Sequence, residues 1–299
     1  MLVAVISLKG SPGVTTFSLA LAACWPSPVR TVLVEADPAG GDVASRFSLA
    51  CSPGLVSLAA AARRSADPQL VWQHTQALPG GLPVVLAPPG AEQAHAALSA
   101  LAAEASTGGG VLRQAASLSQ TVVIADCGRV DVGSAAMPIV RAADVMVLLS
   151  RAHADDLAHL ASRLHTASRW SAHRALLLVG EGYGSTEVAR ELGVPVMGRL
   201  PEDRRGAAML CGRATRPRAK CGGPGDSALG QKAQEIATAL MSQQPSSGVT
   251  SPPVPMVQAV PGEPSTSLPV NGLQVVLPVQ PPTTRPWPGQ GTAQSGVAS

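Results

Sequence analysis

The sequence contains few aromatic and few charged residues. Aromatic side chains make up 2% of the 299 residues, and charged side chains make up 14%. The core must therefore be built mainly from Ala, Val and Leu, which suits a buried parallel sheet covered by helices. The net charge of +3 is too small to imply a nucleic-acid or membrane partner by itself. The length is sufficient for one full domain and an additional segment.

Cysteines and long apolar runs are scarce as well. The five cysteines are odd in number and lack close metal-ligand spacing, so free thiols fit better than a disulfide framework or a zinc site. No run reaches the roughly 18 apolar residues that a membrane-spanning helix needs. Residues 2–8 are apolar but lack the basic flank and cleavage site of a signal peptide. We therefore expect a cytoplasmic protein without a transmembrane segment.

Short apolar runs alternate with stretches of helical character along most of the chain. The runs predict strands at residues 2–8, 31–36, 82–87, 121–126, 144–149, 175–179 and 194–200. Helices are expected at residues 14–24, 54–64, 91–104, 153–170, 185–192, 203–211 and 227–242. This alternation predicts an α/β fold, with a mostly parallel twisted sheet of about seven strands and helices on both faces. Ligands of such sheets bind at the carboxyl ends of the strands.

Residues 244–299 have a different composition from the rest of the chain. They contain twelve prolines, one acid and one base. Such a segment cannot bury enough apolar area to offset the entropy cost of ordering, so we expect a disordered tail with polyproline II character. The patch Leu273–Leu277 and Trp287 are candidate docking sites for a protein partner, and a plain tail is the alternative. The expected division is a domain over residues 1–243 and a tail over residues 244–299.

The segment L-K-G-S-P-G-V-T-T, residues 8–16, joins the first strand to the first helix. Its small residues allow backbone N–H groups to close on a phosphate, and the helix N-terminus favours an anion. The hydroxyl of Thr15 is placed to reach a magnesium ion. Such loops normally carry a lysine after the second glycine, but position 14 is Val, and a lysine occurs earlier as Lys9. An ordinary strand-to-helix turn is the alternative, because short motifs recur by chance.

This loop resembles the deviant P-loop of the ParA/MinD family of ATPases, x-K-G-G-x-G-K-[ST]-T. The matching positions are Lys9, Gly10, Gly13, Thr15 and Thr16, and the departures are Ser11 and Val14. Lys9 is notable because the chain has only three lysines against nineteen arginines. The resemblance extends over roughly residues 1–242 and excludes the tail.

Two acidic segments resemble further elements of the same family. The segment V-E-A-D-P resembles the family's D-x-D-P, with Glu35 as the first acid and Asp37 as the second. The segment I-A-D-C-G resembles its Walker B strand, which delivers Asp126 to the magnesium shell. A carboxylate across from the loop hydroxyl can hold a hydrated ion that bridges phosphates. An Asp-Pro turn and an ordinary strand end are the alternatives.

Two later segments extend the resemblance. The segment R-A-A-D, ending at Asp144, resembles the family's A-D motif at the start of the fifth strand. The segment L-P-E-D resembles the family's I-P-x-D segment near the nucleotide base. The second match implies that Pro201 and Asp203 contact the nucleotide. The family often has an Asn after the sixth strand to read adenine, whereas this chain has Gly180-Glu181-Gly182, which leaves selectivity for adenine open.

The resemblance implies a set of sites for ATP and Mg²⁺. The residues expected to bind the nucleotide are Lys9, Gly10, Ser11, Gly13, Val14, Thr15, Thr16, Pro201 and Asp203. The resemblance implies that Lys9 and Asp37 act in catalysis, and that Thr15, Asp37 and Asp126 hold the metal. In the family, the residue at the position of Lys9 reaches across a nucleotide-sandwich homodimer to the phosphates of the partner.

One basic cluster is a candidate surface for nonspecific DNA. It places six charges in seventeen residues, at Arg204, Arg205, Arg213, Arg216, Arg218 and Lys220. Neutralisation of phosphates by such a cluster would make binding dependent on salt, and a solvated loop is the alternative. MinD-like proteins end in an amphipathic membrane helix, and this sequence shows none at its end.

Position 14 separates the expected fold from the expected activity. Val cannot pair with phosphate oxygens, and the loss of such a charge-assisted contact costs roughly 1.5–3 kcal/mol. The resemblance implies a nucleotide-dependent switch that positions DNA or a cell-envelope machine, with weak ATP binding and slow or absent hydrolysis. The rival interpretation is a pseudo-ATPase scaffold or localisation factor, similar to those of pilus and secretion systems, that recruits partners through its tail. A metabolic enzyme on the same fold is a third class, but the sequence indicates no substrate pocket for it.

Overall fold

The computed structural model describes residues 1–10, 12–105, 110–212 and 223–242. Within this part of the chain, eight strands form one sheet in the order β3-β4-β2-β5-β1-β6-β7-β8. The strands are β1 (Leu2–Ser7), β2 (Arg30–Glu35), β3 (Gln76–Ala77), β4 (Pro83–Val85), β5 (Thr121–Arg129), β6 (Val145–Arg151), β7 (Arg174–Val179) and β8 (Val196–Leu200). The seven predicted strands are all present. The eighth, β3, has two residues, too few to show an alternating pattern.

The helices cover the sheet and follow the predicted order. They are α1 (Val14–Ala23), α2 (Val43–Phe47), α3 (Leu55–Ala62), α4 (Leu70–Gln73), α5 (Ala91–Ala105), α6 (Gly110–Ala116), α7 (Met137–Ala142), α8 (Ala154–Ala167), α9 (Ser185–Leu192), α10 (Arg204–Leu210) and α11 (Ala228–Ser242), with a 3₁₀ turn η1 (Pro224–Asp226). The sequence did not predict α2, α4, α6 and α7. Each has seven residues or fewer, so their periodicity is too short to detect.

The strand order places β1 at the centre of the sheet. It pairs in parallel with β5 on one side and β6 on the other, and the antiparallel pair β3–β4 lies at one edge. The chain leaves β1 through α1 to reach β2, and β5 later fills the place between them. A crevice at such a reversal of strand order is the usual ligand site of an open α/β sheet. The register of β2 with β5 pairs Glu35 with Asp126, so their carboxyl ends coincide.

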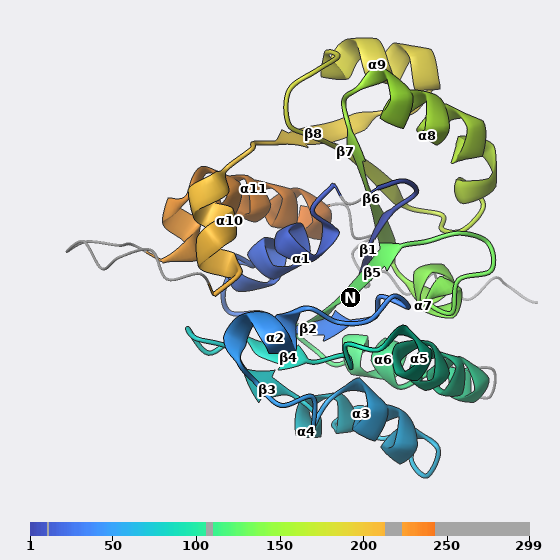
Figure 1. Cartoon of the computed structure of the whole chain (residues 1–299), viewed down its shortest axis with the longest axis vertical. Helices are drawn as coiled ribbons and strands as arrows, with labels where there is room; N and C mark the ends of the chain where they lie inside the picture. Colours follow the sequence, from blue (N-terminus) through green and yellow to red (C-terminus); the bar gives the residue numbers. More distant parts are fainter. Residues whose placement is uncertain (11, 106–109, 213–222, 243–299) are drawn as a thin grey trace, which may run out of the picture. The chain divides into compact units, whose positions relative to one another are not determined.

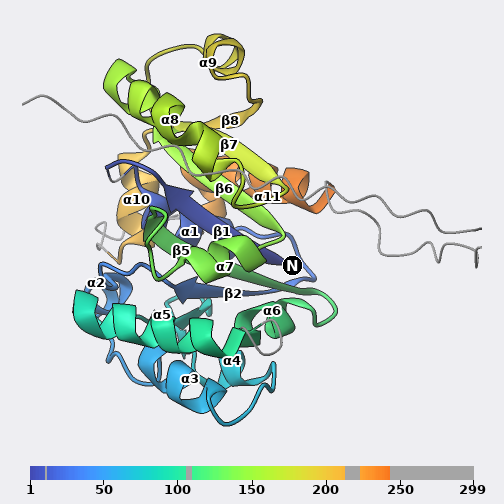
Figure 2. The ribbon, with the colours of Figure 1, turned by 90° about the vertical axis from the view of Figure 1, so that its right-hand side faces the viewer.

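The sheet separates two apolar cores. Along β1, Leu2, Ala4 and Ile6 belong to the core that α3 and α5–α9 cover. The alternate residues Val3 and Val5 belong to the core that α1, α10 and α11 cover. Figure 1 shows α1, α10 and α11 on one side of the strands and α5, α7 and α8 on the other, and Figure 2 shows the same layers after a quarter turn. Strands with both faces buried read as continuous apolar runs, which is why the sequence located them.

Two predictions concern parts of the chain beyond this sheet. The proline-rich tail from residue 244, with its docking patches, lies outside the described residues. None of the described helices combines the length and the hydropathy that crossing a membrane requires.

Candidate functional site

The loop after β1 has the backbone expected of a phosphate cradle. Gly10 (φ 63°) and Gly13 (φ 92°) adopt left-handed conformations, which glycine accepts without a steric penalty. A Cβ at either position would meet no atom within 4 Å, so conformation and not lack of space requires the glycines. Gly13 immediately precedes α1, and no side chain caps the first turn of that helix. Its N–H groups are therefore available to an anion. Ser11 lies outside the described residues.

A cavity of about 630 Å³ opens beside this loop at the carboxyl ends of β1, β2 and β5. The loop contributes Gly10, Gly13, Val14, Thr15 and Thr16 to its lining. The opposite wall includes Asp37 and residues that follow Asp126, and α2 and α5 contribute Asp42, Arg46 and His95. The fold thus brings the predicted phosphate loop together with both predicted acidic segments.

Asp126 lies behind Thr15, at 1% exposure. Burial, together with the negative charges of Glu35 and Asp37, raises the pKa of Asp126 to about 7. The hydrogen bond from the side chain of Thr15 opposes this shift, as does the N–H of Gly128, which donates to Asp126 Oδ1 at 3.2 Å. Hydroxyl and carboxylate oxygens in this arrangement are the donor set that Mg²⁺ prefers.

Asp37 is half-buried and packs against the backbone of Gly128. A Cβ at Gly128 would lie 1.9 Å from Asp37 Oδ2, so glycine is required there by close approach as well as by its φ of 59°. The N–H of Ala39 donates to Asp37 Oδ1 at 2.8 Å. Burial raises the pKa of Asp37, the charge of Asp42 adds to the increase, and Ala39 and Arg129 oppose it.

Glu35 is placed differently from Asp37, although both belong to the V-E-A-D-P segment. Its Oε1 accepts from the N–H groups of Asp42 at 3.0 Å and Val43 at 2.9 Å, and its Oε2 accepts from Ala87 at 3.0 Å. The side chain is 2% exposed and is not among the residues that line the cavity. Glu35 therefore fixes the loop before α2 and the segment after β4.

Val14 packs with the core although it borders the cavity. It is 5% exposed and belongs to the same apolar cluster as Phe17 and Leu21 of α1. The position that normally supplies a cation to the phosphates therefore contributes apolar packing to the layer beneath α1.

Lys9 lies away from the cavity. Its Nζ forms an ion pair with Asp155 Oδ2 at 3.1 Å, at the start of α8, and Lys9 is not among the residues that line the cavity. The roles of Lys9 in nucleotide binding and catalysis stay predictions. A contact with the phosphates of a second chain stays a prediction.

A second cavity of about 250 Å³ adjoins the first, since Gly13 and Thr16 line both. The predicted base-binding residues Pro201 and Asp203 line this second cavity. The carboxylate of Asp203 caps α10 by accepting from Gly206 at 2.8 Å. It also accepts from the N–H of Leu229 at 3.1 Å, and these bonds lower its pKa. Asp203 thus joins α10 to α11 at the rim of the cavity.

The predicted basic cluster is only partly described. Arg204 and Arg205 begin α10, and Arg204 lines the second cavity. The other four members lie outside the described residues.

Three further residues of the large cavity were missed by sequence reasoning. Arg46 lies on α2, His95 on α5, and Arg129 at the end of β5. Arg129 follows Asp126 by three residues, which is the one signal that pointed toward it. Arg46 and His95 reach the cavity through tertiary packing alone.

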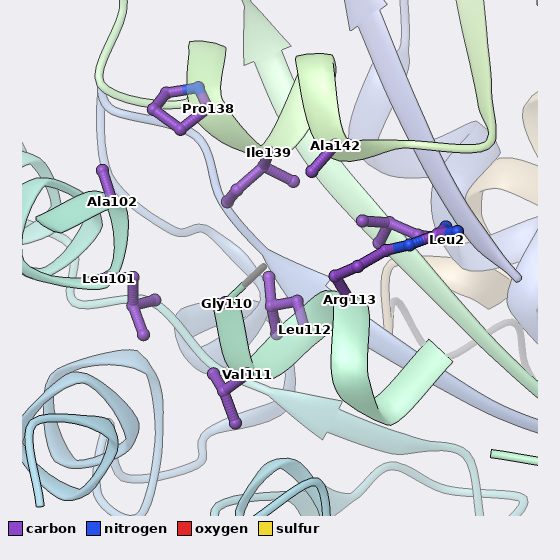
Figure 3. Close-up of a pocket in the computed structure, with 10 residues that line it drawn as sticks. All are labelled: Leu2, Leu101, Ala102, Gly110, Val111, Leu112, Arg113, Pro138, Ile139 and Ala142. Atoms are coloured by element: carbon purple, nitrogen blue, oxygen red, sulfur yellow. The ribbon is translucent and has the colours of Figure 1, made fainter. Parts of the chain in front are cut away.

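A third pocket lies at the opposite end of β1, near Leu2. It holds about 30 Å³, roughly the space of one water molecule. Figure 3 shows apolar side chains of α5, α6 and α7, such as Leu101, Leu112 and Ile139, around it. Its size excludes a nucleotide.

Comparison with known proteins identifies the fold. No family model matches the sequence, and no curated protein matches it. Solved structures do match. A ParA family ATPase from Chlorobium tepidum TLS is 15% identical with a TM-score of 0.61, covering 79% of this chain and 98% of that one. The MinC:MinD cell division protein complex of Aquifex aeolicus is 13% identical with a TM-score of 0.55, covering 82% of this chain and 97% of that one. A Cyanothece McdA–ATP complex is 15% identical with a TM-score of 0.55, covering 80% of this chain and 96% of that one.

These matches, together with the loop geometry, define first a class of fold. The described part of the chain has a P-loop nucleotide-binding α/β fold, with its loop and acids at the carboxyl edge of the sheet. Within that class, the fold is the one of the ParA and MinD ATPases, as the sequence resemblance predicted.

Proposed function

We propose that this protein is a ParA/MinD-like nucleotide-binding switch that binds ATP with Mg²⁺. The observation that carries the proposal is the cavity formed by Gly13–Thr16 at the start of α1, with Asp37 opposite and Asp126 hydrogen-bonded to Thr15. The McdA structure similar to this chain is an ATP complex, which supports the same ligand.

The metal side of the cavity fits Mg²⁺. The negative charge of Asp37 contributes to the raised pKa of Asp126, and a divalent cation would relieve that repulsion. Thr15, Asp37 and Asp126 would hold the ion, directly or through water, and the ion would neutralise charge on the phosphates. Backbone N–H groups of the loop would orient the phosphate chain.

Hydrolysis is proposed to be slow or absent, because Val14 supplies no charge to the transferring phosphoryl group. Charge moves onto those oxygens as the bond breaks, so the effect on the transition state exceeds the effect on binding. The proposed cellular role is partitioning of DNA or positioning of a cell-envelope machine. The support is the fold shared with a ParA family ATPase and with the cell division protein MinD.

A second candidate is a pseudo-ATPase scaffold that recruits partners. The observation that favours it is Val14, which packs in the core below the site.

The proposed partners are a second copy of the chain, with Lys9 acting across the dimer, a protein bound by the tail, and nonspecific DNA at the basic cluster. Gel shifts at low and moderate salt, with the arginines replaced, test the last of these.

Calorimetry with Mg-ATP tests the proposed function and separates the two candidates. Val14→Lys should tighten binding of ATP by about tenfold or more and raise turnover, because a lysine there would reach the phosphates. Val14→Met is the matched control, since it extends the side chain without a charge and should change affinity by less than about twofold. Absence of binding by the wild type at millimolar nucleotide would favour the scaffold. Wild-type turnover that Val14→Lys does not increase would contradict slow hydrolysis.

A further inference from the structure

The cavity that lacks a P-loop lysine is lined by two arginines. Arg46 and Arg129 border the same space as Gly13 and Thr15, and Lys9 does not. Among the described lining residues, these two are the ones that carry a guanidinium or ammonium group. Neither belongs to the predicted site.

Arg46 is held on the side of the cavity nearest the first turn of α1. One guanidinium nitrogen lies 2.9 Å from Asp42 Oδ2, and another lies 3.5 Å from the sulfur of Cys211. That sulfur is 3.9 Å from Thr16 Oγ1. The side chain of Arg46 is 25% exposed, and its partner Asp42 is 69% exposed. The guanidinium has five donors in a planar fork, so these contacts leave donors for an anion.

Arg129 is held on the acid side of the same cavity. It pairs in register with Ser7, the last residue of β1, and the next N–H, of Val130, donates to the carbonyl of Ser7 at 2.9 Å. It directly follows Gly128, whose backbone contacts the carboxylate of Asp37. Arg129 therefore stands where the phosphate loop and the metal-binding acids approach each other.

We infer that Arg46 and Arg129 supply the positive charge for the phosphate chain of the nucleotide, in place of the lysine that position 14 lacks. This inference rests on the proposed function. Arg46 and Thr16 both contact the sulfur of Cys211, and Thr16 also borders the second cavity, so Arg46 contacts the phosphates closer to the nucleoside. Arg129 lies beside Asp37 and contacts the terminal phosphate. Guanidinium groups bind phosphate oxygens in pairs, which suits this task.

The two positions predict different nucleotide preferences. Arg46→Gln should weaken binding of Mg-ATP and Mg-ADP alike, each by about tenfold. Arg129→Gln should weaken Mg-ATP by about tenfold and Mg-ADP by clearly less, because ADP lacks the terminal phosphate. Arg46→Lys and Arg129→Lys keep the charge and should recover part of the affinity. Arg190→Gln is the matched control, since Arg190 is 73% exposed on α9 and paired with Glu191, away from the cavity; it should change affinity by less than about twofold.

The ion pair with Asp42 provides an internal check. Asp42→Asn frees Arg46 and removes a negative charge from the cavity, so it should tighten binding of Mg-ATP. In the Arg46→Gln background the same change should tighten binding by a smaller factor, because part of its effect passes through Arg46. Equal factors in the two backgrounds would contradict a phosphate contact by Arg46.

The experiment is calorimetric titration of the full chain with Mg-ATP and with Mg-ADP, with the thermal unfolding midpoint of each variant measured in parallel. Losses of affinity at an unchanged midpoint, with the stated ATP and ADP pattern, support the inference. If the wild type binds nucleotide and both Gln variants bind as Arg190→Gln does, the inference is overturned and the proposed function stands. If the wild type binds no nucleotide at millimolar concentration, the proposed function fails and the inference fails with it. If the Gln variant of one arginine is unfolded, the Lys variant of that same arginine is measured instead. Affinity of the Lys variant close to the wild type supports the role of that arginine. Affinity within about twofold of the Gln variant at the other arginine overturns it.

Discussion

The two walls of the large cavity differ in how completely they carry the chemistry of a nucleotide site. The loop wall, Gly10 and Gly13–Thr16, has the backbone of a phosphate cradle, but its central side chain, Val14, packs in the core. The acid wall consists of Asp37 and Gly128, and Asp126 lies buried behind it, hydrogen-bonded to Thr15. A phosphate-type loop backbone and candidate metal carboxylates are thus present beside a position 14 that offers no cation.

The largest expected effect concerns the acid wall and follows from the pKa of Asp126. Folding raises this pKa from 3.8 to about 7, so the unfolded chain releases its proton first as pH increases. The free energy of unfolding of the metal-free protein should therefore fall between about pH 4 and pH 7, by at most about 4 kcal/mol. In Asp126→Asn this decrease should be smaller, and the part that remains comes from Glu35 and Asp37, whose pKa values burial also raises. The measurement is urea unfolding in EDTA at pH 4, 6 and 8.

The direction of the stability change in Asp126→Asn at each pH is also predicted, and measurement can contradict it. At pH 4 both proteins carry a neutral group and should be equally stable, while at pH 8 the variant should be the more stable one. Addition of Mg²⁺ at pH 8 should stabilise the wild type and leave the variant unchanged, because the ion needs the carboxylate. A variant that is less stable than the wild type at pH 8 in EDTA would show that the ionised carboxyl contributes to folding.

The sequence predicted the acid wall and the loop wall for a common physical reason. The phosphate loop, Asp37 and Asp126 each follow a buried apolar strand, and parallel strands end at the same edge of the sheet. The apolar runs identified the strands, so the meeting of these residues followed from topology alone. The predicted mostly parallel sheet of about seven strands is confirmed, and the structure adds the short β3 and four short helices.

The remaining details depend on contacts between segments far apart in the sequence. The sequence suggests that Glu35 acts together with Asp37 in the acidic segment. In the structure, however, three backbone N–H groups donate to the carboxylate of Glu35, and one of them comes from Ala87, 52 residues away. Lys9 is paired with a residue 146 positions further along the chain. Arg46 reaches the cavity because α2 lies beside it, and no periodic pattern marks a helix of five residues.

A smaller effect is expected where Gly128 joins the acid wall. Gly128→Ala places a Cβ 1.9 Å from Asp37 Oδ2 on a backbone with positive φ. The left-handed conformation alone costs about 1–2 kcal/mol for a residue with a Cβ, and displacement of Asp37 adds to this. The midpoint of thermal unfolding should fall, and the affinity for Mg-ATP should fall with it because Asp37 moves.

Gly133→Ala is the matched control for that substitution. Gly133 also borders the cavity, but a Cβ there would lie 3.6 Å from Asp131 Oδ1, an ordinary contact. Its free energy of unfolding should stay within about 0.5 kcal/mol of the wild type. Equal losses in the two variants would mean that the contact with Asp37 is not what requires glycine at position 128.

The smallest effect on stability is expected at Lys9, which the loop wall holds away from the cavity. The side chain of Asp155 is 73% exposed, and ion pairs at such exposure contribute little. Asp155→Asn and Lys9→Ala should therefore leave the unfolding midpoint of the nucleotide-free protein unchanged. If Lys9 serves the phosphates of a second copy, Asp155→Asn releases it and should strengthen dimer formation with Mg-ATP, whereas Lys9→Ala should abolish it, as sedimentation velocity would show. A large drop in the midpoint of Lys9→Ala without nucleotide would instead assign Lys9 to the stability of the fold, and the loop wall would then lack a lysine for either chain.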